Sequence, residues 1–300
     1  MGLVLSSGPH LRDKDSTEQI MRDVLLALVP AFVASVIFFG LRSILLVIVS
    51  VFFAVLTGMI CDVMRRRKST IHDGSAVLTG VLLALTCPPG LPLWMVALGS
   101  FVGLAIAKEA FGGLGFNIFN PALVGRAFLL ASYPVAMTTW NMPGQAIIAA
   151  NTGATPLGMI AESTFDKLPV LKDLILGNIG GSLGETSALA LLIGAAYLIY
   201  KKIIDWRIPA SYIGTVAILS FVFGQDPMFH IFAGGLILGA FFMATDYVTS
   251  PMTTSGKLIF GLGAGILVVV IRLWGGYPEG VCYSILLMNA VTPLLDKLKK

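Results

Sequence analysis

The chain has 300 residues, of which 56% are hydrophobic and 12% are charged, and its mean hydropathy is +0.89. These values lie far outside the range of soluble proteins and indicate a polytopic membrane protein, with room for about ten spans of roughly 20 residues each. The net charge of +4 comes without a basic patch interleaved with aromatic residues, which argues against nucleic-acid binding.

The first 22 residues are polar and mixed in charge, and they lack the apolar core of a secretory signal peptide. We expect a cytoplasmic tail over residues 1–22, within a single all-α membrane domain that covers residues 1–300. Apolar runs bounded by charges or by Gly and Pro predict the helices. They are expected near residues 23–40, 43–61, 75–88, 92–108, 121–135, 187–200, 209–224, 229–246, 257–273 and 279–295.

Three of these expected helices, 75–88, 121–135 and 187–200, are too short to cross a hydrocarbon core of about 30 Å at about 1.5 Å per residue. We interpret them as half-helices, whose free backbone groups need protein or a water-filled cavity around them. Ordinary tilted helices whose ends extend further are the alternative.

An alignment of the sequence with itself, at an offset of 112 positions, also suggests an inverted repeat. It aligns Asp73, Ser75, Ala76, Trp94, Phe111 and Gly112 with Glu185, Ser187, Ala188, Trp206, Phe223 and Gly224.

The basic residues favour one orientation of these ten spans. With the N-terminus in the cytoplasm, four basic residues fall outside, Arg126 falls inside a span, and the other fifteen fall on the cytoplasmic side, as the positive-inside rule requires. The outer four are Arg42, Lys167, Lys172 and Arg272. The cytoplasmic fifteen are Arg12, Lys14, Arg22, Arg65, Arg66, Arg67, Lys68, Lys108, Lys201, Lys202, Arg207, Lys257, Lys297, Lys299 and Lys300. We therefore expect a multi-pass membrane protein, with both termini cytoplasmic and the loop 136–186 facing outward.

The three cysteines, Cys61, Cys87 and Cys282, lie far apart in the sequence and form no C-x-x-C pair. Metal or cluster ligation within this chain is therefore unsupported. We expect buried structural thiols and no resident metal.

The most informative loop is Asn-Thr-Gly-Ala-Thr-Pro-Leu-Gly, residues 151–158. Gly153 and Ala154 leave the backbone uncrowded beside Thr155, and Pro156 pushes Thr155 toward an extended conformation because its ring restricts the preceding residue. The Thr155 hydroxyl is thereby presented to its surroundings. A plain structural turn and a modification or ligand site both fit this pattern.

Four other stretches are polar or Gly-rich where a lipid-facing helix should not be: residues 73–89, 112–122, 177–187 and 244–251. An unpaired acid at the bilayer centre costs about 2.5 to 3.5 kcal/mol, so these stretches are expected to face one another or water. Asn117 and Asn120 offer donors and acceptors for a flavin ring edge or an ion, and Asp246 is a candidate for an ion pathway. Helix capping, helix packing and plain solvation are the alternatives for each.

Taken in order, these stretches resemble one family. The chain reads D-G-S-A-x-L-T-G-x-L-L-A-L, then G-G-x-G-x-N-x-F-N-P-A, then T-G-A-T-P-L, then G-S-L-G-E-T-S-A-L-A, then F-F-M-A-T-D-x-x-T-S-P-M-T. This order resembles the NqrB/RnfD family of ion-pumping respiratory complexes from about residue 70 to residue 260. The short segment before the first helix is similar to the RnfD branch, because NqrB chains carry a longer N-terminal portion.

The resemblance implies a membrane electron carrier with FMN joined through its phosphate to Thr155, within an acceptor loop that includes Gly153 and Ala154. A second, noncovalent flavin or riboflavin is compatible with it, and no catalytic acid or base is needed because the flavin carries the electrons. One departure is Ala149, where the family often has an acidic residue.

The implied complex passes electrons between ferredoxin and NAD while it moves Na+ or H+, and the implied partners are the other Rnf subunits, RnfA, RnfB, RnfC, RnfE and RnfG, together with membrane lipid. This chain has no nucleotide-binding fingerprint or cluster-ligand set, so its electrons must come from such partners. The competing hypothesis is a secondary transporter or channel of urea-channel-like architecture without redox activity.

Overall fold

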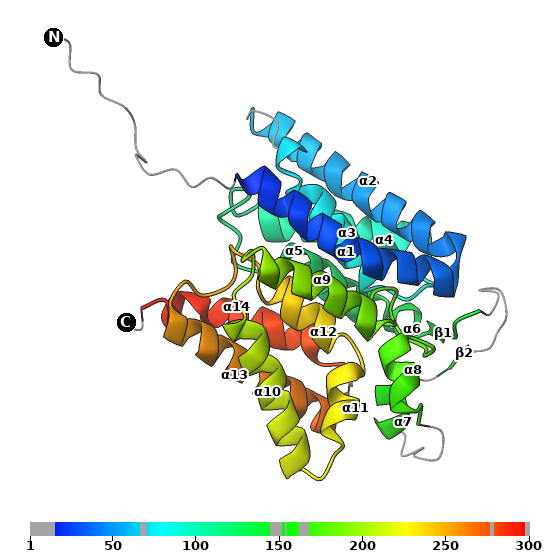
Figure 1. The fold of residues 1–300 in the computed structure, drawn as a ribbon. Helices are drawn as coiled ribbons and strands as arrows, with labels where there is room; N and C mark the ends of the chain where they lie inside the picture. The colour runs from blue at the N-terminus through cyan, green and yellow to red at the C-terminus, as the bar shows by residue number, and fades with distance from the viewer. Residues whose placement is uncertain are drawn as a thin grey trace.

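The computed structural model describes residues 16–66, 71–144, 152–153, 155–161, 168–276 and 279–297. Within these ranges the chain is almost entirely helical (Figure 1). The α-helices are α1 (Thr17–Phe39), α2 (Leu41–Met64), α3 (Ser75–Leu85), α4 (Leu93–Val102), α5 (Pro121–Ser132), α6 (Pro134–Met137), α7 (Pro156–Ala161), α8 (Leu171–Leu176), α9 (Ala188–Tyr200), α10 (Arg207–Val222), α11 (Pro227–Phe232), α12 (Leu236–Leu238), α13 (Thr254–Trp274) and α14 (Val281–Leu295). The described strands, β1 (Trp140–Asn141) and β2 (Thr152–Gly153), form one antiparallel pair.

The helices match the expected membrane architecture. Among the described residues, α1, α2 and α13 are each long and apolar enough to cross a membrane unaided. The three segments expected as half-helices are indeed short, because α3, α5 and α9 have 11, 12 and 13 residues. At about 1.5 Å per residue each of them covers less than 20 Å. The prediction of an all-α, polytopic membrane protein is confirmed.

The first two helices form a hairpin whose ends are set by local sequence. Ser16 begins α1 with a capping box in which its hydroxyl accepts from Gln19 N and the Gln19 side chain accepts from Ser16 N. Gly40 separates α1 from α2 with a φ of +67°, a conformation that L side chains rarely adopt. Helix α9 packs closely against α1, because Gly194 lies so near the Ala27 carbonyl that a Cβ there would overlap it.

Two pairs of helices run parallel and side by side. In the pair α2 and α4, the Ser50 and Ser100 hydroxyls lie 2.9 Å apart, and Arg65 of the α2 end pairs with Glu109 at 3.6 Å. Helix α4 reaches Glu109 through a π-helix, η2 (Gly103–Glu109), which lies within the span expected to end at residue 108. In the pair α10 and α13, Gly261 lies against Ile208, and further along Phe223 stacks edge-on against Trp274.

These pairs define a repeat that differs from the alignment at an offset of 112. Helix α5 returns antiparallel to α4, just as α14 returns antiparallel to α13. Helix α2 runs toward the face that holds the described termini and α10 runs away from it, so the two halves are inverted. The packing thus equates α2, α4 and α5 with α10, α13 and α14, whereas the offset of 112 equated α4 with α10. Asp73 accepts from Ser75 N at the start of α3, whereas Ser187 caps α9 and the Glu185 carboxylate points at Gly235, so Asp73 and Glu185 are not equivalent.

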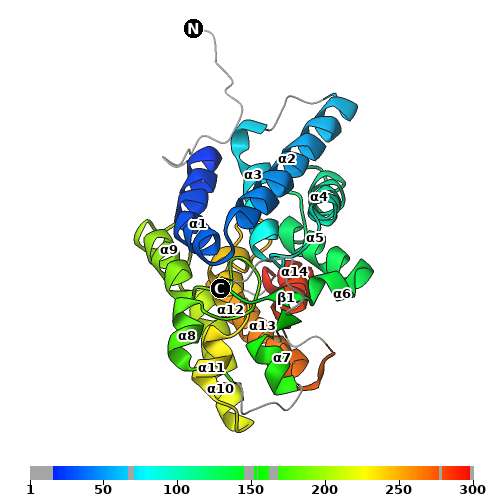
Figure 2. The same ribbon diagram turned by 90° about the vertical axis from the view of Figure 1, so that its right-hand side faces the viewer.

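Broken helix ends meet at the centre of the bundle. After α3 ends, Cys87 O accepts from Leu183 N at 3.1 Å and Leu85 O accepts from Gly184 N at 2.7 Å, so two connecting segments satisfy each other's backbone groups. Gly184 permits this contact, because a Cβ there would lie 2.8 Å from Leu85 Cβ. Figure 2 places α12 and α14 at this centre, surrounded by the other helices.

The span expected over 229–246 is broken, which the sequence analysis did not foresee. Helix α11 ends at Phe232, and the chain restarts at α12 and continues as a π-helix, η4 (Gly239–Met243). Gly234 permits the break with a φ of +68°. The buried Arg272 guanidinium fills the gap, because it donates to His230 O at 2.5 Å and to Ala233 O at 3.0 Å.

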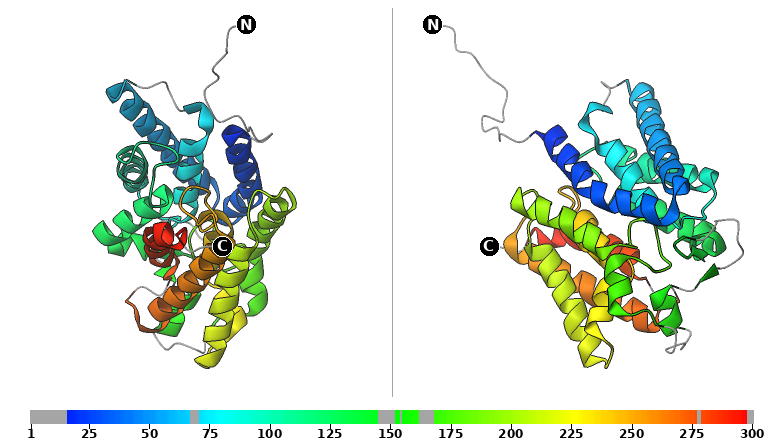
Figure 3. Two further views of the ribbon diagram at one scale, coloured as in Figure 1. Left: turned by 90° about the vertical axis from the view of Figure 1, so that its left-hand side faces the viewer. Right: turned by 45° about the vertical axis from the view of Figure 1, so that its right-hand side comes forward.

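The molecule has two opposite faces. The start of α1 and the end of α14 lie on one face, where Asp23 pairs with Lys201 and Met252 N donates to Asp296. The strand pair, α7 and α8 lie on the other, as Figure 1 and the right-hand view of Figure 3 show. Both termini of the described chain therefore lie opposite Thr155, as expected from the charge pattern. The expected outward loop 136–186 contains the end of α6 together with β1, β2, α7 and α8.

Candidate functional site

Thr155 stands at the start of α7, immediately after the strand pair. Its hydroxyl accepts from Gly158 N at 3.0 Å and its carbonyl accepts from Met159 N at 2.8 Å, so Thr155 caps the helix. Gly153 pairs with Trp140 in the strand pair, which fixes the chain just before Thr155. Ala154 and Ala149 lie outside the described residues. Thr155 itself is half-buried and borders a cavity, so its hydroxyl is held in place and remains accessible.

The cavity beside Thr155 leads toward charged side chains. It is about 10 Å³ in volume, and it is lined by Thr155, Pro156, Leu157, Ile179, Gly180, Gly181, Glu185, Gly234 and Glu279. A space of this size holds about one water molecule. Glu185 and Glu279 also line a second cavity of about 10 Å³, which Arg126 and Cys282 border. Two carboxylates thus stand between Thr155 and the centre of the bundle.

Arg126 joins this centre from α5. Its Nη2 donates to Glu279 Oε2 across 153 positions of sequence, and its side chain is 4% exposed. A lone arginine inside an apolar run is a signal of a buried partner, and the sequence analysis placed Arg126 in a span without naming that partner. Glu279 was not identified, because the sequence analysis placed it at the first position of the span expected over 279–295 and gave it no role; α14 begins two residues later, at Val281.

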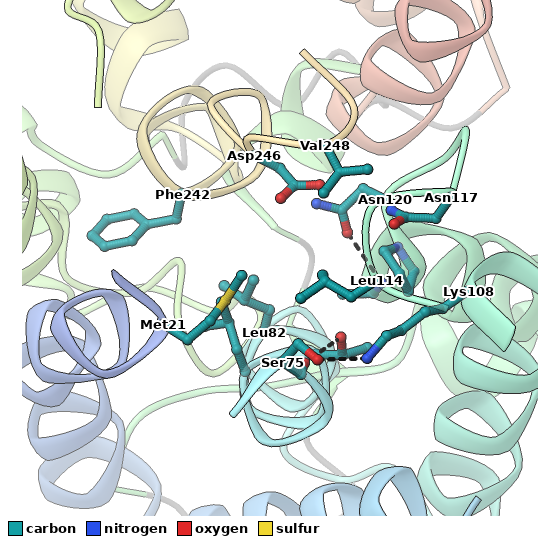
Figure 4. Close-up of a pocket in the computed structure, with 14 residues that line it drawn as sticks. Met21, Ser75, Leu82, Lys108, Leu114, Asn117, Asn120, Phe242, Asp246 and Val248 are labelled. Atoms are coloured by element: carbon teal, nitrogen blue, oxygen red, sulfur yellow. Dashed lines mark hydrogen bonds between the residues drawn. The ribbon is translucent and has the colours of Figure 1, made fainter. Parts of the chain in front are cut away.

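A larger cavity lies in the half of the molecule nearer the termini (Figure 4). Its volume is about 50 Å³, and its polar lining comes from Ser75, Thr79, Lys108, Asn117, Asn120 and Asp246. Asp246 and the two asparagines form one wall, and Lys108 with Ser75 lies on the opposite wall. Lys108 is 3% exposed and its Nζ lies 2.5 Å from Ser75 Oγ, which in turn donates to Asp73 Oδ1 at 2.5 Å.

Asn117 and Asn120 therefore line the same cavity, and that cavity is distinct from the one beside Thr155. Asn120 caps α5, because its Oδ1 accepts from Ala122 N at 3.0 Å, and its Nδ2 donates to Met243 O at 3.4 Å. The Asn117 Nδ2 donates to Phe119 O at 3.3 Å, and its buried Oδ1 has no partner among the described residues. An unsatisfied buried acceptor of this kind marks a place for a donor from a ligand or from water.

Asp246 lies at the edge of this cavity. It follows the π-helix η4, is half-buried, and accepts from Thr249 Oγ1 at 3.0 Å. Asp246 and Thr155 line different cavities in opposite halves of the protein. Lys108 was missed, since the sequence analysis assigned it to a solvated helix end.

Cys87 and Cys282 are buried, in agreement with the expected structural thiols, whereas Cys61 is half-exposed. The Cys282 thiol donates to Leu123 O at 3.3 Å. Within the described ranges, no three His, Cys, Asp or Glu side chains gather as a metal site would require.

The fold and these sites define a class: a polytopic α-helical membrane protein with broken helices, a presented threonine on one face and a polar cavity in the opposite half. The family model for the NQR2, RnfD, RnfE family matches residues 4–300. The chain belongs to this family, as the order of its motifs predicted.

Curated relatives support the same assignment. The chain is 52% identical, over 98% of its length and 93% of the relative's, to the D component of the proton-translocating ferredoxin:NAD(+) oxidoreductase complex of Clostridium ljungdahlii. It is 48% identical, over 100% of its own length and 94% of the relative's, to the D component of the Na(+)-translocating ferredoxin:NAD(+) oxidoreductase complex of Acetobacterium woodii. It is 40% identical, over 95% of its own length and 91% of the relative's, to the D component of the ion-translocating oxidoreductase complex of Stutzerimonas stutzeri.

Proposed function

We propose that this protein is the RnfD component of an ion-translocating ferredoxin:NAD oxidoreductase complex, and that it relays electrons through FMN attached covalently to Thr155. The relatives that bear the name of this component match nearly the whole chain. The observation that carries the flavin assignment is the half-buried Thr155 hydroxyl at the mouth of a cavity, in a loop fixed on both sides by β2 and α7.

The local structure fits attachment through a phosphate. The Gly158 amide donates at 3.0 Å to the Thr155 oxygen that would bear the phosphate, and Gly180 and Gly181 line the same cavity without side chains that would crowd it. The cavity has room for about one water molecule, so an attached flavin ring would lie outside it. Bound there, FMN would supply one-electron and two-electron chemistry, while the chain supplies position and electrostatics.

The partners follow from what the sequence lacks. Electrons would reach and leave this protein through the other Rnf subunits, RnfA, RnfB, RnfC, RnfE and RnfG. The face that carries Thr155 would be the outer face of the bacterial cytoplasmic (inner) membrane, because α2 and α9 end on the opposite face and the basic residues Arg65, Arg66, Lys201 and Lys202 directly follow those ends.

The cavity of Asn117, Asn120 and Asp246 is the candidate for a second ligand. Its unsatisfied Asn117 Oδ1, and the placement of Lys108 and Asp246 on its opposite walls, suit either a polar ring edge or an ion. At about 50 Å³ it holds a few waters or an ion, and a noncovalent flavin or riboflavin would have to widen it. We assign Asp246 to the ion pathway on this basis.

Intact mass spectrometry of the chain purified from its native membrane tests the flavin assignment. We expect a covalent FMN adduct, fluorescence of the band on a denaturing gel, and a fragment that localises the adduct to Thr155. Thr155→Ala should abolish the adduct and leave the fold intact, because a half-buried hydroxyl contributes little packing.

Thr152→Ala is the matched control, since Thr152 lies in the same loop and should leave the flavin in place. An adduct on Thr152 would overturn the choice of acceptor but keep the class of protein. Absence of any covalent flavin in the natively expressed chain would favour the transporter or channel hypothesis.

A further inference from the structure

The charged cluster of Glu185, Arg126 and Glu279 lies at the inner end of the Thr155 cavity, and the function proposed above leaves it without a role. Arg126 is 3% exposed and Glu185 is 7% exposed. Arg126 donates through Nη2 to Glu279 Oε2, but its Nη1 and Glu279 Oε1 have no partner among the described residues. Buried polar atoms of this kind need a partner, and the cavity beside them has room for a water molecule.

Glu185 is the less constrained of the two carboxylates. The ion pairs of the described residues include one between Glu279 and Arg126 and none to Glu185. The Glu185 carboxylate points at Gly235, where a Cβ would lie 2.5 Å from Glu185 Oε1. The missing side chain at Gly235 therefore keeps a place for this carboxylate between the two small cavities.

The charges around Glu185 are balanced when both carboxylates are ionised. Arg126 faces it from α5, Arg272 lies nearby on α13, and Glu279 comes from the segment before α14. The thiols of Cys87 and Cys282 also lie nearby. Two cations and two anions leave no spare positive charge to compensate an electron added close by. In a site shielded from water, such an electron favours the neutral form of the nearest free carboxylate.

We propose that Glu185 binds one proton when the group attached at Thr155 gains an electron, and that it releases this proton when the electron leaves. The inference rests on the proposed function, in which a partner redox protein of the complex supplies the electron. The proton comes from water on the Thr155 face through the small cavity and forms an O–H bond on a Glu185 carboxylate oxygen. Nothing else is oxidised or reduced in the step. Glu279 stays ionised because Arg126 holds it.

Infrared difference spectroscopy of the purified complex, oxidised against reduced, tests this step. We expect a carboxylic acid C=O band to appear on reduction, to vanish in Glu185→Gln and to persist at a shifted frequency in Glu185→Asp. Gly235→Ala should shift or abolish the band, because the new Cβ displaces the carboxylate. Gly214→Ala is the control: Gly214 lies on α10 and lines neither small cavity, and a Cβ there meets nothing within 4 Å, so the band should remain.

Flavin content separates this proposal from the proposed function. Each variant is first checked for assembly by size exclusion and for covalent flavin by in-gel fluorescence. A band that persists in flavin-loaded Glu185→Gln would overturn the role of Glu185 and leave the electron relay intact. If wild type carries no flavin, both fail. If Glu185→Gln does not assemble, the two glycine variants supply the test, and identical bands in Gly235→Ala and Gly214→Ala would overturn the proposal.

Discussion

Replacement of Arg272 by methionine should destabilise the protein strongly. The Arg272 guanidinium donates at 2.5 Å to His230 O and at 3.0 Å to Ala233 O, where the chain breaks between α11 and α12. Methionine keeps most of the length of the side chain but leaves both carbonyls without a donor. Hydrogen bonds to charged groups contribute about 1.5 to 3 kcal/mol each, so we expect a loss of about 3 to 6 kcal/mol. The uncompensated negative end of the α11 dipole adds to this loss.

The assay is thermal denaturation in detergent, followed as the fraction of protein that elutes folded after heating. Arg272→Met should melt at a clearly lower temperature than wild type. Lys172→Met is the control, because it removes a positive charge from an exposed position of α8 on the same face and should leave the melting temperature unchanged. Because Gly234 and Glu279 line the Thr155 cavity, flavin content should also fall in Arg272→Met. Equal melting temperatures for the two variants would refute the view that Arg272 holds the break together.

Three further predictions concern the contact between α9 and α1, the orientation in the membrane and the larger cavity. Gly194→Ala should lower the melting temperature, because its Cβ overlaps the Ala27 carbonyl and separates α9 from α1; Gly214→Ala, with nothing within 4 Å, should not. Lys172→Cys should react with an impermeant thiol reagent in intact cells. Labelling only after the cells are opened would show that the inferred membrane orientation is wrong. Asp246→Asn should depress ion transport and electron flow together with covalent flavin unchanged, and a variant with full ion-coupled turnover would remove Asp246 from the pathway.

The helices could be predicted from sequence because each depends on local signals. The half-helices α3, α5 and α9 begin where Gly74, Asn120 and Ser187 interrupt apolar runs, and those runs are too short to span a bilayer. The position of Thr155 between the apolar runs could be predicted in the same way, because Gly153 and Pro156 flank it; its role as the flavin acceptor stays a prediction. Family membership followed from the order of such stretches, and the match over residues 4–300 confirms it.

Long-range contacts could not be predicted, because no local pattern encodes them. The Arg126 partner lies 153 positions away, and the break after Phe232 depends on Arg272, which is 39 positions beyond Ala233. From Ile231 to Ala244 the sequence reads as one apolar run, and its glycines do not mark a break because glycine is frequent in membrane helices. Lys108 reads as a helix-end lysine, and its burial against Ser75 appears only when α3 and η2 are packed together.

Helix α5 connects the larger polar cavity with the small cavity around Glu185. Asn120 at its start lines the larger cavity, and Arg126, six positions along the same helix, lines the cavity shared by Glu185 and Glu279. At about 1.5 Å per residue these positions are about 9 Å apart, which is close enough for a charge at one end to act on the other in a medium of low dielectric constant. Asn120 also donates to Met243 O, three residues before Asp246. A change in charge at Glu185, which shares a cavity with Arg126, therefore has a short, rigid route to the Asp246 cavity, along one helix and across one hydrogen bond.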